Sequence, residues 1–216
     1  LIPIKSNLID GIHKDKIVKR KPFYSLNSKS VGESHKSKIN KVRNILKFKK
    51  ADYLFISSPE NVAWLMNVRG YDNPTSPIPN ARLLISKNKK LFLVVDEKIA
   101  SKLIKEKKFQ RNQIINPTRF EELIKKLRGN KFIIDASSCS ILNEKIIKSN
   151  FNVIDDVDPC FKLKSVKNSV EIKNTINAHI EDGLALTRFI YWIKNINKKK
   201  ITEIEAKNKL QKFRKL

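Results

Sequence analysis

Residues 57–79 read Ser-Ser-Pro-Glu-Asn-Val-Ala-Trp-Leu-Met-Asn-Val-Arg-Gly-Tyr-Asp-Asn-Pro-Thr-Ser-Pro-Ile-Pro, and this stretch predicts a strand end, a helix and an irregular loop. Ser58 is expected to cap the helix, and Pro59 suits the first helical position, where its missing N–H costs nothing. Trp64 is expected to belong to the core instead of forming a ligand platform. The apolar side chains that recur at helical spacing on one face are Val62, Leu65 and Met66.

The proline-rich loop after this helix carries the candidate binding residues. The helix is expected to end at Arg69 and Gly70, because glycine tolerates the left-handed conformation of a C-cap. Prolines within 74–79 then fix an extended loop that presents Arg69 and Asp72 rigidly. Such a pair either binds a substrate, for example a peptide terminus, or forms a mutual salt bridge that only holds the loop. Arg69 and Asp72 are the candidate substrate-binding residues, with both alternatives open.

Length and composition set the broad class. The chain has 216 residues, 40% of them hydrophobic, which suits one large domain or one domain plus part of another. Cys139 and Cys160 match no metal spacing and no disulfide framework, which favours a reducing, cytoplasmic setting. No apolar run has membrane-spanning length, and the first residues are not a signal peptide. Because the chain opens on Leu1 and stops within a helical pattern, we expect a fragment.

Basic residues dominate the charge, with 46 Lys and Arg against 21 Asp and Glu and a formal net charge of +25. A nucleic acid or an acidic membrane is one class of partner that such a charge attracts. The lysines, however, recur in turns, helix ends and linkers instead of lining one stripe, and no aromatic residues interleave with them as in base-stacking motifs. We expect a solvated basic surface with no specific nucleic-acid partner and no membrane partner.

The order of the remaining elements indicates an α/β fold. Apolar and β-branched runs predict strands at 53–56, 81–86, 91–95, 114–115, 132–134 and 153–154. The second and third of these form a hairpin. Amphipathic helices are expected to begin at Ser34, Asp96, Thr118 and Ser140, and Thr118 with Glu121 fits a capping box. Strands and helices alternate apart from the hairpin, which predicts a mixed sheet with flanking helices.

The character of the chain changes to helices alone after the last strand. Three aspartates within 155–158 lack the spacing of a calcium loop and are expected to mark a linker. Residues 168–196 carry apolar side chains at helical spacing and predict one long buried helix. Residues 202–205 fit a second capping box, which opens a helix still running where the sequence stops. Its Leu210 and Phe213 are expected to be poorly covered.

The sequence holds none of the residue sets that a hydrolase needs for catalysis. His13, His35 and His179 are isolated, and it contains no His-Glu-x-x-His motif, no Gly-x-Ser-x-Gly motif and no glycine-rich phosphate loop. Glu181 and Asp182 follow His179, but residues this close in a helix face different ways. We expect His179 to form a hydrogen bond within the helix packing, and we assign no catalytic residue and no metal ligand.

Several motifs, in order along the chain, resemble the Xaa-Pro aminopeptidases, the aminopeptidase P group of the creatinase, prolidase and methionine aminopeptidase superfamily. The strongest is Pro-Glu-Asn-Val-Ala-Trp-Leu-Met-Asn-Val-Arg-Gly-Tyr-Asp at 59–72 with Pro-Ile-Pro at 77–79, which looks like their middle domain. Val-Gly-Glu-Ser-x-x-x-Lys at 31–38 is similar to the family's Gly-x-Ser-x-x-x-Lys helix start. Lys-Asn-x-x-Glu at 167–171 resembles the crossing into the catalytic domain.

The resemblance covers nearly the whole chain, with two departures. Residues 7–12 look like the segment by which these enzymes leave their first domain. Residues 178–186 and motifs within 202–214 look like the first two helices of the catalytic domain. The family usually has Trp at the position of His13, and many members have His at that of Thr75, which weakens a direct substrate role for the proline-rich loop.

The resemblance implies a three-domain, cytosolic and often dimeric enzyme that removes the residue before proline from the N-terminus of proline-containing peptides. It also implies a pair of divalent metals, usually manganese or zinc, which activates a bridging hydroxide and polarises the scissile carbonyl. The family's metal ligands and catalytic histidines lie beyond the position of Arg214, so the resemblance places none of them in this chain.

We therefore expect a lead-in segment at 1–21, a creatinase/prolidase-like middle domain at 22–157, and the truncated start of a pita-bread catalytic domain at 158–216. Our first hypothesis is the non-catalytic portion of an Xaa-Pro aminopeptidase, inactive by itself. The alternative is a degenerate, non-enzymatic interaction module with a basic surface. A reading frame next to this one that encodes the metal ligands would support the first hypothesis.

Overall fold

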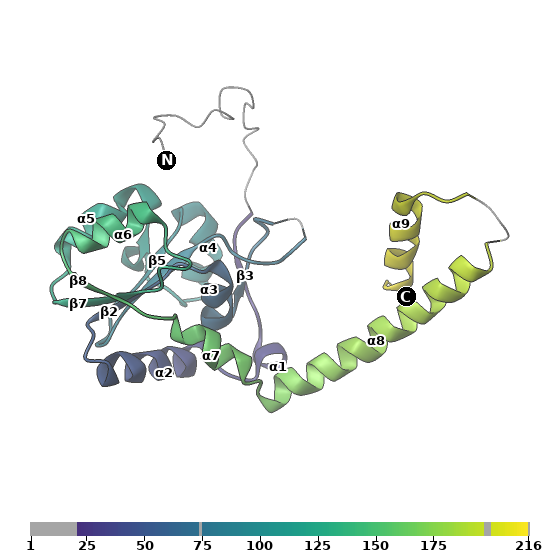
Figure 1. Ribbon diagram of the computed structural model, residues 1–216, viewed down its shortest axis with the longest axis horizontal. Helices are drawn as coiled ribbons and strands as arrows, with labels where there is room; N and C mark the ends of the chain where they lie inside the picture. Colours follow the sequence, from purple (N-terminus) through teal and green to yellow (C-terminus); the bar gives the residue numbers. More distant parts are fainter. Residues whose placement is uncertain (1–20, 74, 197–199, 216) are drawn as a thin grey trace, which may run out of the picture.

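A mixed six-stranded sheet lies at the centre of the structure, a computed structural model that describes residues 21–73, 75–196 and 200–215 (Figure 1). The strands lie in the order β6 (Ile114–Ile115), β5 (Leu91–Val94), β4 (Arg82–Ser86), β2 (Tyr53–Ile56), β7 (Lys131–Ile134) and β8 (Asn152–Asp155). The pairs β4–β5 and β2–β4 are antiparallel, whereas β5–β6, β2–β7 and β7–β8 are parallel. The predicted α/β fold with a mixed sheet and a hairpin is confirmed.

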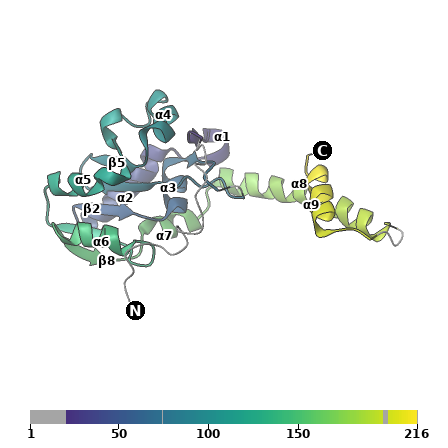
Figure 2. The same ribbon diagram turned by 90° about the horizontal axis from the view of Figure 1, so that it is seen from above.

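Helices cover both faces of this sheet (Figure 2). The helices of this domain are α1 (Ser28–Val31), α2 (His35–Phe48), α3 (Pro59–Met66), α4 (Glu97–Lys105), α5 (Phe120–Lys126), α6 (Ile141–Lys148) and α7 (Pro159–Ser165), with 3-10 turns η2 (Arg111–Gln113) and η3 (Pro117–Arg119); α1 packs against the C-terminal arm and not on the sheet. Apolar residues of α2, α3, α4 and α7 form one core with the sheet, and those of α5 and α6 form a second core on the opposite face. The sheet is the middle of three layers.

Strand β2 supplies side chains to both cores, which explains its unbroken apolar sequence. Leu54 and Ile56 pack in the core beneath α2 and α3, whereas Tyr53 and Phe55 pack in the core beneath α5. All four side chains are buried, as expected for a strand at the centre of a sheet covered on both faces. Phe55 lies 5.0 Å from the Phe120 ring between centroids, so α5 is fixed against β2 by an aromatic contact.

The end of α3 differs from the sequence prediction. The helix stops at Met66, and Asn67 takes the left-handed conformation (φ 52°, ψ 47°) that we had assigned to Gly70. Val68 and Arg69 instead form β3, which pairs antiparallel with β1 (Tyr24–Ser25). Gly70 is needed for a different reason, because a Cβ atom there would lie 2.8 Å from the Cα of Pro79.

Two predicted helix caps also differ in the structure. Ser58 occupies the N-cap position of α3, but its hydroxyl donates to Glu60 Oε2 (2.6 Å) and makes no capping bond. Thr118 does not form a capping box, because the chain enters α5 through η3, whose N-cap is Asn116. The Asn116 side chain accepts from the Thr118 backbone N–H (3.0 Å). The capping box of Thr202 and Glu205 is confirmed at the start of the last helix.

The C-terminal helices form an arm that projects from the domain (Figure 1). It consists of α8 (Ser169–Lys194) and α9 (Glu203–Phe213), which pack on each other. The long helix was predicted correctly, but its predicted burial was wrong. Of its residues only Ala185 is buried, and Ile180 is 66% exposed. The described residues offer α8 too few neighbours to cover its apolar side chains.

The connection between the sheet and the arm is folded against the domain. Asp158, expected in a linker, is 1% exposed, caps α7 and accepts from Asn61 Nδ2 (2.7 Å). Cys160, two residues after Asp158, is fully buried in the core. Helix α7, which follows this connection, packs on α2 and α3. The predicted division between two domains at 157/158 stays a prediction.

Candidate functional site

Arg69, one of the two predicted binding residues, lies at the end of β3 and is half-buried. Its Nη1 donates to the backbone carbonyls of Ala63 (3.2 Å) and Val68 (3.0 Å). Burial lowers the pKa of Arg69, although an arginine remains charged after such a shift. The guanidinium is thus held at the end of α3 and does not extend freely from the proline-rich loop.

Asp72, the second predicted binding residue, lies in the proline-rich loop and contributes to its closure. Its Oδ2 accepts from the Asn80 backbone N–H (2.7 Å), and the Gly70 N–H donates to the Pro77 carbonyl (3.1 Å). Tyr71, between them, lies 5.1 Å from the Tyr24 ring between centroids. These contacts join the two ends of the loop, and the assignment of substrate binding to Arg69 and Asp72 stays a prediction.

Three cationic side chains converge on the C-terminal end of α3. Besides Arg69, Lys38 Nζ donates to the Trp64 carbonyl (3.0 Å) and Asn67 Oδ1 (2.8 Å). Lys108 Nζ donates to the Met66 carbonyl (3.0 Å). The last carbonyls of a helix lack partners within it and carry its negative partial charge, so cations stabilise this end. Because these acceptors are neutral, they do not balance the positive charge of the three side chains.

Lys38 ends the motif at 31–38, and no role was predicted for it. It is 1% exposed, and its Nζ lies 4.3 Å from the centroid of the Trp64 ring. Burial lowers the pKa of Lys38, while Glu171 and Glu33 act in the opposite direction. The signal was available, because Lys38 falls four residues before Val42 on the apolar face of α2.

The base of α8 is fastened to the domain next to these cations. Asn168 and Glu171 form a capping box that begins α8, and Asn168 Nδ2 donates to the Val31 carbonyl (2.9 Å). Gly32 has a φ of 68°, and a Cβ atom there would lie 2.5 Å from Asn168 Oδ1. Another residue at this position would be strained and would collide with the cap. The residues quoted for the resemblance at 31–38 and 167–171 therefore meet at one place.

A hollow of about 400 Å³ lies where these elements meet, and we call it the junction hollow. The residues that matter for its chemistry are Lys38, Trp64, Arg69, Lys167, Glu171 and Thr175. It separates the C-terminal end of α3 from the first turns of α8. Its walls combine a buried amine, a guanidinium, an indole and a carboxylate, which can bind a polar ligand but include no nucleophile paired with a base.

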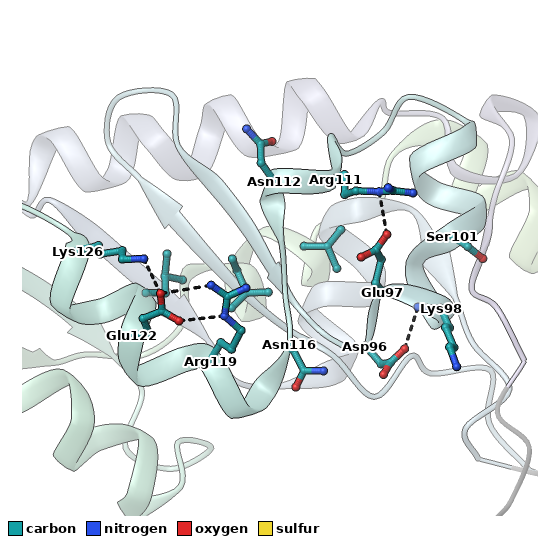
Figure 3. Close-up of a pocket in the computed structure, with 13 residues that line it drawn as sticks. Asp96, Glu97, Lys98, Ser101, Arg111, Asn112, Asn116, Arg119, Glu122 and Lys126 are labelled. Carbon is teal, nitrogen blue, oxygen red and sulfur yellow. Dashed lines mark hydrogen bonds and ion pairs between the residues drawn. The ribbon is translucent and has the colours of Figure 1, made fainter.

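A larger groove of about 850 Å³ runs beside β6, between the start of α4 and α5 (Figure 3). Most of its charged side chains pair with one another: Arg111 Nε lies 2.8 Å from Glu97 Oε1, and Arg119 Nε lies 2.9 Å from Glu122 Oε2. Lys126 also contacts Glu122. Because these charges are satisfied within the groove, it offers less to a charged ligand than the junction hollow.

The described residues do not fit a metal pair. Within 21–73, 75–196 and 200–215, no three His, Cys, Asp or Glu side chains converge as a metal ion would require. His35 is half-buried, and burial lowers its pKa, whereas His179 is exposed on α8 and not packed as we expected. His13 lies outside the described residues. None of the described helices combines the length and apolar character that a membrane crossing needs.

Comparison with known proteins gives the same family as the motifs. The family model of the creatinase/prolidase N-terminal domain matches residues 15–171. The Xaa-Pro aminopeptidase ApepP of Drosophila melanogaster is 31% identical over 99% of this chain, and Xaa-Pro aminopeptidase 1 of Dictyostelium discoideum is 30% identical over 96%. The chain spans only 36% and 35% of the lengths of these relatives.

Solved structures share the fold. The X-prolyl aminopeptidase of Caenorhabditis elegans, described as a cytosolic enzyme with a di-nuclear active site, superposes with a TM-score of 0.84 and 23% identity. That match covers 100% of this chain and 36% of the other. An X-Pro aminopeptidase from Thermotoga maritima gives a TM-score of 0.61 over 82% of this chain and 48% of its own, with 15% identity. The chain belongs to the creatinase/prolidase N-terminal domain family.

Proposed function

We propose that this chain is the non-catalytic, middle-domain portion of an Xaa-Pro aminopeptidase, together with the first helices of the catalytic domain. In this proposal the sheet domain is a scaffold, and the contacts of Asn168 at the base of α8 fix the direction in which α8 leaves the domain. Catalysis belongs to sequence that the longer relatives have and these 216 residues lack. The isolated chain is inactive.

The exposed face of α8 is the observation that carries this proposal. Ile172, Ile176, Ile180 and Leu184 recur every four residues and are 49%, 55%, 66% and 55% exposed. A helix with such a row of apolar residues is stable in water when another element covers it. The cover we propose is the remaining part of the catalytic domain, because the relatives continue well beyond the length matched here.

The finer properties of the complete enzyme follow from the same proposal. It removes the residue before proline from peptides, holds two divalent metals, manganese or zinc, and works in the cytoplasm, with a homodimer as its assembly. Arg69 and Asp72 are proposed to contact or steer the substrate from the edge of the scaffold. The proposal also includes the division into a lead-in segment at 1–21, a middle domain at 22–157 and the start of the catalytic domain at 158–216.

A chimera tests the proposal. These 216 residues replace the matched segment of the Drosophila relative, and release of the first residue from an Xaa-Pro peptide is measured with manganese. We expect turnover by the chimera, none by the isolated chain, and none by the relative with that segment deleted. Turnover by the isolated chain would contradict the proposal. A folded but inactive chimera would favour the alternative, an interaction module that uses the chain's net charge of +25.

Asp substitutions on α8 test the proposed cover. Ile176→Asp and Ile180→Asp place charges on the face that the catalytic domain is proposed to bury, so we expect the chimera to lose activity or fail to assemble. In the isolated chain the same changes should leave the domain folded. Asn177→Asp, at an exposed position of the same helix outside this row, makes the same one-unit change in charge and is the matched control. Equal activity of all three variants would contradict the proposed cover.

A further inference from the structure

The junction hollow holds more positive charge than its carboxylate can balance. Lys38, Arg69 and Lys167 line it, and Glu171 is the acidic residue among the lining side chains described. The Glu171 carboxylate is already engaged, since its Oε2 accepts from the Asn168 backbone N–H (2.9 Å). Lys38 is 1% exposed and donates only to a carbonyl and an amide oxygen, so water screens its charge poorly.

Two side chains that line the hollow, Trp64 and Arg69, have N–H donors without an acceptor in the described part of the chain. The Nε1 atom of Trp64 is buried and has no acceptor within the described ranges. Arg69 donates through Nη1, and its Nε and Nη2 have no acceptor among the described residues. A buried N–H that lacks an acceptor is costly, and a guanidinium fork matches the two oxygens of a carboxylate.

We propose that the junction hollow binds a carboxylate, and that its source is the C-terminal carboxylate of a short peptide. This inference rests on the proposed function, because a peptidase scaffold meets short peptides. The carboxylate would accept from Arg69, with the Trp64 ring and the positive charge of Lys38 in the wall of the same hollow. Phosphate is the competing anion, and it would have to lie beside the Glu171 carboxylate, which lines the same hollow. The volume of about 400 Å³ is within the range of small-ligand sites.

The two tryptophans of the chain give a direct measurement of this binding. In ¹⁵N-labelled protein, Trp64 and Trp192 each give one indole N–H signal, and Trp192→Phe assigns them. Titration with Ala-Pro-Gly should shift the Trp64 signal and leave that of Trp192, which contacts Lys209 in the arm, in place. Ala-Pro-Gly amide should not shift Trp64. Ala-Pro-Glu amide carries its carboxylate on a side chain. A weaker shift with this peptide than with Ala-Pro-Gly is expected if the site takes a C-terminal carboxylate, and an equal shift would contradict that source.

Two arginine variants complete the test. Arg69→Gln should weaken binding of Ala-Pro-Gly about tenfold or more, because hydrogen bonds between charged groups are strong. Arg119→Gln removes the same charge in the groove beside β6 and should leave binding unchanged. An unshifted Trp64 signal, equal binding of the amide or of inorganic phosphate, or equal affinity of Arg69→Gln would overturn the proposal. Binding is read without turnover, so an inactive chimera would not be mistaken for failure of this site.

Discussion

The sheet domain and the α8–α9 arm use similar amino acids and differ in what surrounds them. In the domain, Leu54, Leu84 and Phe132 are at most 1% exposed between layers of helix. In the arm, Ile176 and Ile180 have the same apolar character and are more than half exposed. Helices with side-chain caps occur in both regions, α2 in the domain and α8 in the arm among them, so local signals suffice to form a helix. Burial depends on a second surface, and the described chain provides one for the domain only.

The largest expected effect separates the two regions by stability. Phe132 is fully buried between the rings of Tyr53 and Phe151, at centroid distances of 5.4 and 5.2 Å. We expect Phe132→Ala to lower the free energy of unfolding by about 3–5 kcal/mol, as for other buried phenylalanines. Ile180→Ala should change it by less than about 0.5 kcal/mol. Denaturant unfolding measures both, and equal losses would mean that α8 is packed as tightly as β7.

The buried lysine of the junction should give the next largest effect. Lys38→Met leaves the Trp64 carbonyl and Asn67 Oδ1 without their donor, which should cost about 1–3 kcal/mol. Lys41→Met, on the same helix, removes a half-exposed lysine paired with Glu33 and should cost under about 1 kcal/mol. Thermal and denaturant unfolding of the two variants give the comparison. An unchanged free energy of unfolding in Lys38→Met would show that the polar contacts at the end of α3 do not stabilise the domain.

Acid should affect the domain through Asp52. Its ion pair with Lys87, together with the backbone N–H groups of Asn130 and Lys131, lowers the pKa of Asp52 to about 2. A lowered carboxylate pKa stabilises the fold above the ordinary pKa of about 3.9, and this contribution of up to about 2 kcal/mol is lost as pH falls from about 4 to 2. Unfolding curves over this range should show a smaller acid sensitivity in Asp52→Asn.

The arm contains the matched control for this prediction. Arg214 lowers the pKa of Asp182 as well, but both side chains are 49% exposed and water screens the pair. Asp182→Asn should therefore leave the acid sensitivity of unfolding unchanged. If it flattened the pH dependence as much as Asp52→Asn, the arm would have to unfold together with the domain.

The smallest expected effect concerns the same ion pair. Arg214 Nε donates to Asp182 Oδ1 (2.6 Å) and holds α9 against α8. We expect Arg214→Gln to leave the global unfolding free energy unchanged and to speed amide exchange in α9 by less than about tenfold. Leu210 and Phe213 should exchange fast already in the unmodified chain. Strong protection of their amides would show that the arm has a cover within these residues.

The candidate site was predicted less completely than the fold. Arg69 was identified, but its position at the end of α3 depends on a turn at Asn67, which the sequence analysis assigned to Gly70. Lys38 and Glu171 lie far apart in the chain, and only the packing of α2 beside the base of α8 brings them to one hollow. Periodicity assigns a residue to a face of its own helix and gives no information about the helix opposite.

The sequence by itself determined where the strands of the main sheet and most of the long helices form, because apolar spacing, prolines and caps act over a few residues. It therefore predicted the mixed sheet, its hairpin and the length of α8. Tertiary structure alone decided that Asp158 is buried, that Lys38 lies under Trp64 and that α8 remains exposed. The physical reason is that burial and charge pairing depend on surfaces contributed by distant segments, and nothing within one helix specifies whether such a surface is present.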